Sequence, residues 1–245
     1  MCTVAHNEDN SHTDRNRTAL VVARFGSQPA FHAYTYLGDL PSGAFAFNDA
    51  GIGFTLNYVG PTRPRCPGLA RGFFSRSLLD ARSLDEAVRA ITDARGAGGH
   101  NYQLFSFGGS RDPRVINVET APGGEHAVRR IGSTPFFHAN QYTALAVPQL
   151  ISNSSAHRTA RAAELLPRIA ATKAAAMSAA LRNAIGDQHD RSYPIYHDEL
   201  SHARGDLSDW TIASATFDLH ARKMRIYRGN PQKDAVLLEL PLESA

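Results

Sequence analysis

Cys2 is the residue of this sequence with the most chemistry to offer, because it directly follows the initiator methionine. A small residue at position 2 favours removal of Met1, which would make Cys2 the free N-terminus. Its α-amino group, with a reference pKa of roughly 7.7–8.0, could then accept the proton of its own thiol near neutral pH. Cys2 is therefore predicted to be both nucleophile and base of an amide-cleaving enzyme. The alternative is that its position is incidental.

The composition is that of a globular protein without a nucleic-acid or membrane partner. The 245 residues carry a formal net charge of +3, and 42% of them are hydrophobic, enough for a sizeable core. No apolar stretch approaches the ~20 residues of a membrane span, and the polar start does not resemble a signal peptide. Arginines are interleaved with acidic residues, which disfavours nucleic-acid binding. Two cysteines, Cys2 and Cys66, fit a reducing compartment, so we expect a cytoplasmic protein.

Strand-rich and helical blocks alternate along the chain. Runs rich in β-branched and aromatic residues, separated by turn residues, predict strands at 18–25, 30–36, 44–49, 51–59, 101–109, 114–120, 126–131, 136–140, 210–218, 223–229 and 235–242. Helix is predicted over 73–95, with Ser83 and Glu86 as a capping box, and over 155–186, where Pro167 marks a break or kink. No linker or internal repeat divides the chain. We therefore expect one domain over residues 1–245, with packed sheets covered by helices.

Several segments, in their order and spacing, resemble the penicillin acyltransferase group of cysteine N-terminal-nucleophile hydrolases. They are AHNEDN from Ala5, YLGDLPSGAFAFNDAGIGFTLNYV from Tyr36, FFSRSLLDARSLDEAVRAI from Phe73, GHNYQLF from Gly99, VINVETAP from Val115 and FFHANQY from Phe136. This group includes β-alanyl-amine hydrolases that act on carcinine and N-β-alanyldopamine. The resemblance runs from about residue 6 to residue 148, and more weakly to the C-terminus. It implies an α+β fold, the four-layer αββα sandwich of these hydrolases.

The resemblance also implies three site residues and a reaction. Cys2 would supply the attacking thiolate, with its own amine as the proton shuttle. Asp9 matches the aspartate of the family's Asn-x-Asp turn, which orients the amine and nearby donors. Asn140 matches the asparagine that donates to the oxyanion, a contribution of about 3–4 kcal/mol. The implied reaction is hydrolysis of, or acyl transfer from, a small N-acyl amine such as a β-alanyl amine or a penicillin-like amide, with no metal or cofactor.

Two departures from the family pattern leave alternatives open. In the family the nucleophile strand turns back and the Asn-x-Asp motif ends the return strand, whereas only residues 3–8 separate Cys2 from Asp9 here. Seven residue steps span at most ~25 Å. Either the hairpin is shortened and Cys2 reaches the site, or MCTVA is the return strand, Cys2 is incidental and the chain is a truncated or degenerate, non-catalytic relative. The family's α segment is also missing, so a separate α chain or a homo-oligomer is an expected partner.

Three other polar features receive structural interpretations. Glu119 ends a predicted strand, where an acid is usually solvated. Histidine and aspartate at positions 189, 190, 197 and 198 form the densest cluster of potential metal ligands, but their spacing matches no regular metal motif. Cys66 lies in a loop rich in Pro and Arg without a neighbouring base, and is interpreted as a spare thiol.

Overall fold

The computed structural model describes residues 2–108, 114–198 and 209–242. These residues divide into two compact units, each built on one antiparallel sheet. Unit 1 comprises the described residues within 1–17, 133–139 and 152–241, and unit 2 those within 18–132, 140–151 and 242–245. The single domain over residues 1–245 stays a prediction.

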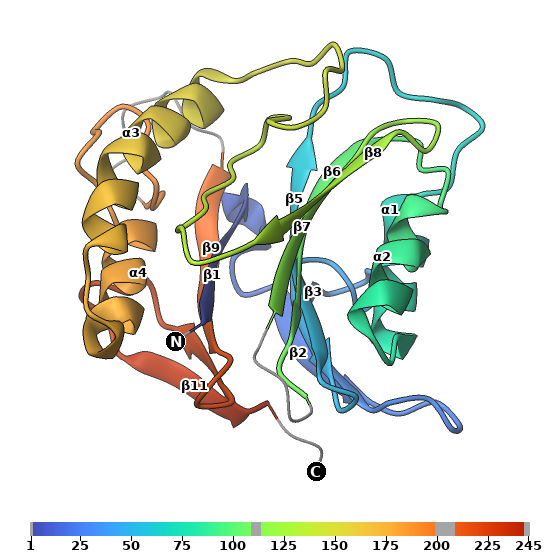
Figure 1. The fold of residues 1–245 in the computed structure, drawn as a ribbon, viewed down its shortest axis with the longest axis horizontal. Coiled ribbons are helices and arrows are strands. Elements are labelled where there is room, and N and C mark those ends of the chain that lie inside the picture. The colour runs from blue at the N-terminus through green and yellow to red at the C-terminus, as the bar shows by residue number, and fades with distance from the viewer. Residues whose placement is uncertain (1, 109–113, 199–208, 243–245) are drawn as a thin grey trace. The chain divides into compact units, whose positions relative to one another are not determined.

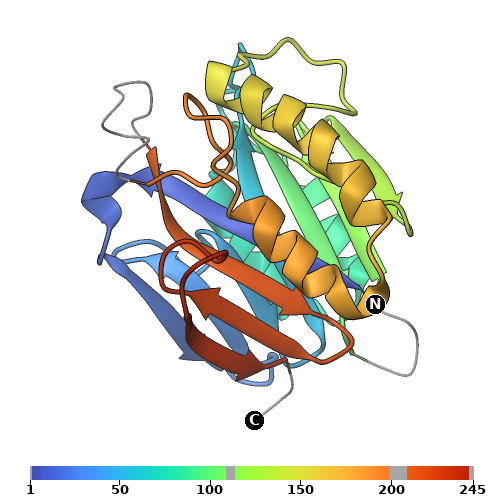
Figure 2. The same ribbon diagram turned by 90° about the vertical axis from the view of Figure 1, so that its left-hand side faces the viewer.

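Unit 1 is a four-stranded sheet with two helices (Figures 1 and 2). The sheet has the order β1-β9-β10-β11, and its elements are β1 (Thr3–Ser11), β9 (Asp209–Asp218), β10 (Lys223–Tyr227), β11 (Val236–Pro241), α3 (Asn153–Ala170) and α4 (Met177–Ile185). The helix α3 begins where the Ser152 hydroxyl accepts the Ser155 amide, and it continues through Pro167 to Ala170. Of the two alternatives predicted at Pro167, the break is wrong, and the kink stays a prediction. The helix α4 packs on β1 and β9.

The strand β1 forms one edge of this sheet and runs along β9 without a turn. Its partners on β9 run from Asp218, opposite Thr3, to Asp209, opposite Ser11, with a bulge between Glu8 and Asp9. Cys2 continues the same line, since its carbonyl oxygen accepts the Leu219 amide at 3.0 Å. The segment between Cys2 and Asp9 is thus one strand and not a shortened hairpin.

Unit 2 is a seven-stranded antiparallel meander in the order β2-β3-β4-β5-β6-β7-β8. Its strands are β2 (Thr18–Ala23), β3 (Phe31–Tyr36), β4 (Phe45–Asn48), β5 (Ile52–Val59), β6 (Gly99–Ser106), β7 (Arg114–Thr120) and β8 (His126–Ile131). The predicted turn between β4 and β5 is confirmed: Gly51 has φ +84° and its amide bonds the Asn48 carbonyl at 3.1 Å. Only glycine adopts such a backbone readily.

The helices α1 (Arg71–Ser77) and α2 (Leu84–Thr92) cover one face of this meander (Figure 1). Apolar side chains of both helices, such as Phe74, Leu84 and Ile91, join Tyr102 and Leu104 of β6 in the core of unit 2. The predicted cap of α2 is confirmed, because the Ser83 hydroxyl accepts the Glu86 amide at 3.2 Å. Short 3-10 turns lie at His12–Asp14, Leu78–Asp80 and Ala174–Ala176.

The strand predicted at residues 136–140 is wrong. Residues 133–151 contain only an isolated bridge, between Gln149 and Pro61. Pro135 directly precedes this segment and lacks the amide that a strand ladder needs. At the other end of the segment, the Asn140 side chain bonds the Tyr58 carbonyl at 2.9 Å.

Candidate functional site

Asp9 lies in a polar centre at the C-terminal end of β1. The Thr211 hydroxyl, on the paired strand β9, donates to Asp9 Oδ1 at 2.7 Å. The Arg158 guanidinium of α3 lies on the other side, with Nη1 3.8 Å from Asp9 Oδ2. Two strands and a helix of unit 1 therefore converge on one carboxylate, which we call the Asp9 centre (Asp9, Arg158, His197 and Thr211).

Arg158 is a largely buried cation. Its side chain is 11% exposed, and its Nε donates to the backbone carbonyl and the hydroxyl of Ser154 at 3.2 and 3.1 Å. Burial lowers the pKa of Arg158, while the negative charges of Asp9 and Asp209 raise it by less. A buried guanidinium beside a carboxylate is a costly arrangement to keep, and such groups gather at functional sites.

His197 completes the Asp9 centre from the loop before β9. Its backbone amide donates to the Thr211 hydroxyl at 2.9 Å, and this hydroxyl donates onward to Asp9. The ring is 3% exposed, and Nδ1 lies 3.9 Å from Asp9 Oδ2, beyond hydrogen-bond range. Neither ring nitrogen has a hydrogen-bond partner within residues 2–108, 114–198 and 209–242. The centre thus presents an imidazole with unused bonding capacity.

Cys2 lies at the opposite end of β1. Its side chain is partly buried and forms no disulfide. Burial raises the pKa of the Cys2 thiol; the positive chain terminus lowers it by less, and the charge of Asp218 adds to the rise. While Met1 precedes Cys2, this raised pKa reduces the thiolate fraction at neutral pH.

The structure does not bring Cys2 and Asp9 together. Along an extended strand of ~3.3 Å per residue, seven residue steps separate their backbones by about 23 Å. The pairing of Thr3 with Asp218 and of Asp9 with Thr211 fixes this separation within unit 1. The convergence of thiol and carboxylate that the resemblance implies is therefore absent from β1 as described.

Asn140, the third predicted site residue, belongs to unit 2. Its side-chain amide donates to the Tyr58 carbonyl at the end of β5, at 2.9 Å. The backbone that follows is held by Glu119, which is completely buried and accepts from residues 143–145. The expectation that Glu119 is solvated is wrong, because four donors replace the water that its carboxylate gives up.

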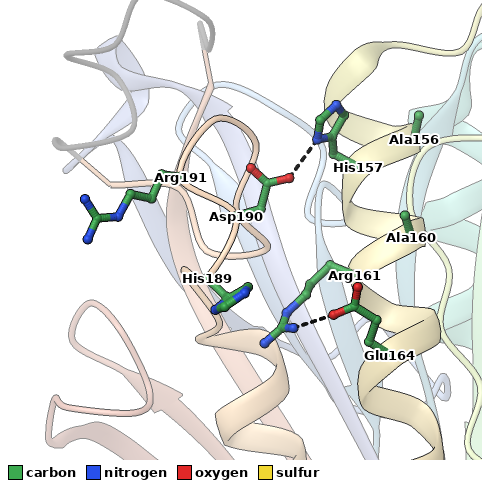
Figure 3. Close-up of a pocket in the computed structure, with 8 residues that line it drawn as sticks. All are labelled: Ala156, His157, Ala160, Arg161, Glu164, His189, Asp190 and Arg191. Carbon is green, nitrogen blue, oxygen red and sulfur yellow. Dashed lines mark hydrogen bonds and ion pairs between the residues drawn. The ribbon is translucent and has the colours of Figure 1, made fainter.

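A surface pocket of unit 1 contains none of the three predicted residues (Figure 3). It lies between α3 and residues 189–191. His157 of α3 bonds Asp190 at 2.7 Å, and Arg161 pairs with Glu164 on the same helix at 2.6 Å. Among the described residues no group of three or more His, Cys, Asp or Glu side chains could hold a metal ion.

A comparison with models of protein families identifies the family of the chain. Residues 2–233 match the family described as acyl-coenzyme A:6-aminopenicillanic acid acyl-transferase. The chain belongs to this family. The predicted resemblance is confirmed, and relatives within the family are hydrolases and acyltransferases that act on carbon–nitrogen amide bonds.

One curated relative is the beta-alanyl-dopamine/carcinine hydrolase of Drosophila melanogaster. It is 28% identical over 224 residues, which cover 86% of this chain and 55% of that protein. The chain thus spans about half the length of the curated relative it matches. Family membership extends over nearly the whole chain, while the relative has a further half without a counterpart here.

Solved structures confirm the fold. A mutant conjugated bile acid hydrolase from Clostridium perfringens superimposes with a TM-score of 0.55 at 13% identity, covering 98% of this chain and 88% of that one. Penicillin V acylase from Agrobacterium tumefaciens gives a TM-score of 0.46 at 14% identity, covering 92% and 78%. The α+β fold of the αββα N-terminal-nucleophile class, predicted from the sequence, is confirmed by the first of these. The part of the chain that the structure describes has no helix long and apolar enough to cross a membrane.

Iodoacetamide is expected to alkylate Cys66 faster than Cys2 at neutral pH. Cys66 is exposed, whereas Cys2 is partly covered and its pKa is raised by burial. Peptide mass spectrometry over a time course measures both rates, with Cys2→Ser and Cys66→Ser variants to assign the peptides. Faster alkylation of Cys2 would show an activated thiol and would contradict this description.

Proposed function

We propose that this chain serves the hydrolysis of, or acyl transfer from, a small N-acyl amine, and that the reacting end of unit 1 is the Asp9 end of β1. Family membership and the activity named for the Drosophila relative support the reaction class. The location of the reacting end rests on the Asp9 centre, where the carboxylate of the Asn-x-Asp motif lies beside the buried Arg158 guanidinium. The substrate class proposed is the β-alanyl amine or a similar small amide.

In this proposal Asp9 orients the α-amine that accompanies the attacking thiol, and it orients the nearby hydrogen-bond donors, as the resemblance implies. Arg158 holds positive charge beside that carboxylate, with Nη1 3.8 Å from it. Asn140, held by the Tyr58 carbonyl, stays the proposed donor to the oxyanion. Neutral or cationic donors fixed before the reaction stabilise the negative charge that an attacked amide carbonyl develops.

Cys2 does not supply the attacking thiol in this proposal. To reach the Asp9 end, its strand would have to leave β9 over the six residues Thr3–Glu8. At about 0.5–1.5 kcal/mol for each hydrogen bond, breaking such a ladder costs roughly 3–9 kcal/mol. This is comparable to the whole stability of a typical domain, about 5–15 kcal/mol. The described β1 therefore favours the interpretation in which Cys2 is incidental.

The thiol is then supplied by another chain or segment, and the described residues alone are non-catalytic. A separate α chain or a second copy of this chain are the partners proposed for this role. The competing candidate is catalysis by Cys2 itself, which is favoured by the presence of a thiol and, after removal of Met1, an amine in one residue. The free state of both cysteines supports a cytoplasmic location, which we also propose.

Binding and turnover of carcinine separate these candidates. We expect Cys2→Ala to bind carcinine within twofold of the wild type in calorimetry, and neither protein alone to cleave it. Asp9→Asn is expected to weaken binding about tenfold, since a bond to a charged group contributes about 1.5–3 kcal/mol. Asp85→Asn, at an exposed position of α2, is the matched control.

The outcomes are distinct. Wild-type turnover that Cys2→Ala abolishes would establish Cys2 as the nucleophile and overturn the proposal. Equal binding by wild type and Asp9→Asn would remove the Asp9 centre from the site. Absence of carcinine binding to the wild type would exclude this substrate for the chain.

A further inference from the structure

A completely buried carboxylate stands beneath the loop that carries Asn140. Glu119, at the end of β7, has 0% exposure. Its Oε1 accepts the amide and the hydroxyl of Thr143, both at 2.7 Å. Its Oε2 accepts the amides of Ala144 and Leu145, both at 2.9 Å. One side chain therefore bonds three successive backbone amides of an irregular segment.

Further bonds hold the same loop on the side nearer Asn140. The Gln149 side chain accepts the Tyr142 amide at 2.7 Å and donates to the Tyr142 carbonyl at 3.1 Å, which closes the loop on itself. The Tyr142 hydroxyl donates to the carbonyl of Thr120, the residue after Glu119, at 3.0 Å. The end of β7 thus holds the loop through Glu119 and through Thr120.

We propose that Glu119 is a positioning residue, which places the Asn140 amide by fixing residues 143–145. Asn140 reaches the Tyr58 carbonyl across 82 residues of sequence, so the course of the loop decides where its amide lies. The role of Asn140 toward the substrate rests on the proposed function. The placement of the loop by Glu119 does not depend on that function. A carboxylate suits the position because both oxygens accept, and all four groups that face them donate.

Hydrogen exchange tests the placement without any assay of activity. Glu119→Gln turns one acceptor into a donor that faces two donors. We expect the amides of Thr143, Ala144 and Leu145 to exchange at least about tenfold faster, while those of β6 keep their rates. Glu125→Gln, at an exposed position in the adjoining turn, is the matched control. Thr143→Val removes only the hydroxyl bond at an exposed position, and should raise exchange about twofold if Glu119→Gln does not fold.

A double-mutant cycle on carcinine binding then tests the connection to Asn140. Asn140→Ala and Glu119→Gln are each expected to weaken binding about 3–10-fold. If Glu119 acts through Asn140, the double variant binds no more weakly than Asn140→Ala alone. A merely structural role would instead give losses that multiply.

Each outcome decides one claim. Unchanged exchange of residues 143–145 in Glu119→Gln overturns the positioning role. Faster exchange with multiplying losses in the cycle overturns the connection to Asn140. If carcinine does not bind the wild type, this substrate assignment fails, and hydrogen exchange alone decides the positioning role.

Discussion

Replacing Asn7 by alanine is expected to lower the free energy of unfolding by about 2–4 kcal/mol. Asn7 opens the Asn-x-Asp motif, yet its contacts are structural. Its side-chain amide donates to the carbonyls of Ile185 and Ile195 at 2.7 and 3.1 Å, and its oxygen accepts the Ser214 hydroxyl at 2.7 Å. Loss of this side chain removes three partly buried hydrogen bonds, each contributing about 0.5–1.5 kcal/mol net.

Urea unfolding followed by circular dichroism measures this effect. Asn10→Ala is the matched control on the same strand, because within residues 2–108, 114–198 and 209–242 the Asn10 side chain accepts only the adjacent Ser11 amide, at 2.8 Å. We expect that control to change the unfolding free energy by less than about 1 kcal/mol. Equal losses in the two variants would show that Asn7 does not connect α4 and the following loop to β1.

Acidification from pH 7.5 to pH 5 is expected to lower the free energy of unfolding of unit 2 by about 2 kcal/mol through protonation of His100 alone. His100 is 7% exposed, and burial, assisted by the positive charge of Arg71, lowers its pKa to about 3. A histidine whose pKa is about 6.5 when unfolded binds its proton in that state first. The contribution of neutral His100 to the free energy of unfolding is therefore complete above pH 6.5 and is lost as the pH falls toward 3.

The His100→Gln variant isolates this contribution, since glutamine does not titrate. The unfolding free energy of the variant should fall by about 2 kcal/mol less than that of the wild type between pH 7.5 and pH 5. His126→Gln, at an exposed position of β8, should keep the wild-type pH dependence. Identical profiles for wild type and His100→Gln would show that His100 is not buried in its neutral form.

Local patterns in the sequence were sufficient for most of the fold. The strands of the meander follow from runs rich in β-branched and aromatic residues, and the turn at Gly51 and the cap at Ser83 follow from local residue chemistry. The continuation of the helix through Pro167 and the irregular backbone at 136–140 did not follow, because a proline is compatible with either a break or a kinked, continued helix, and a short apolar run is compatible with more than one backbone conformation.

The candidate site was less predictable than the fold. Asp9 was accessible through the Asn-x-Asp motif, but its partner Thr211 lies 202 residues away in sequence. Arg158 carries no local signal that distinguishes it from other arginines, and His197 stood out only as a member of a histidine and aspartate cluster whose spacing matches no metal motif. Glu119 was misjudged as solvated, because the donors that satisfy it come from a loop 24–26 residues further along.

The number of residues between Cys2 and Asp9 does not decide whether the two side chains lie close together in space. Seven steps allow contact if the chain turns and exclude it if the chain is extended. Pairing with β9 decides the matter, since Thr3 lies opposite Asp218 and Asp9 lies opposite Thr211. Because that pairing partner comes from the far end of the chain, the sequence around Cys2 could not reveal it.

A spin label on Cys2, in a Cys66→Ser background, tests the central claim most directly. Paramagnetic broadening of amide signals reports which residues lie near the label in solution. We predict strong broadening at Asp218 and Leu219, beside Cys2, and retained signals at Asp9 and Thr211, about 23 Å along β1. Strong broadening at Asp9 and Thr211 would place the thiol at the Asp9 centre and contradict the account.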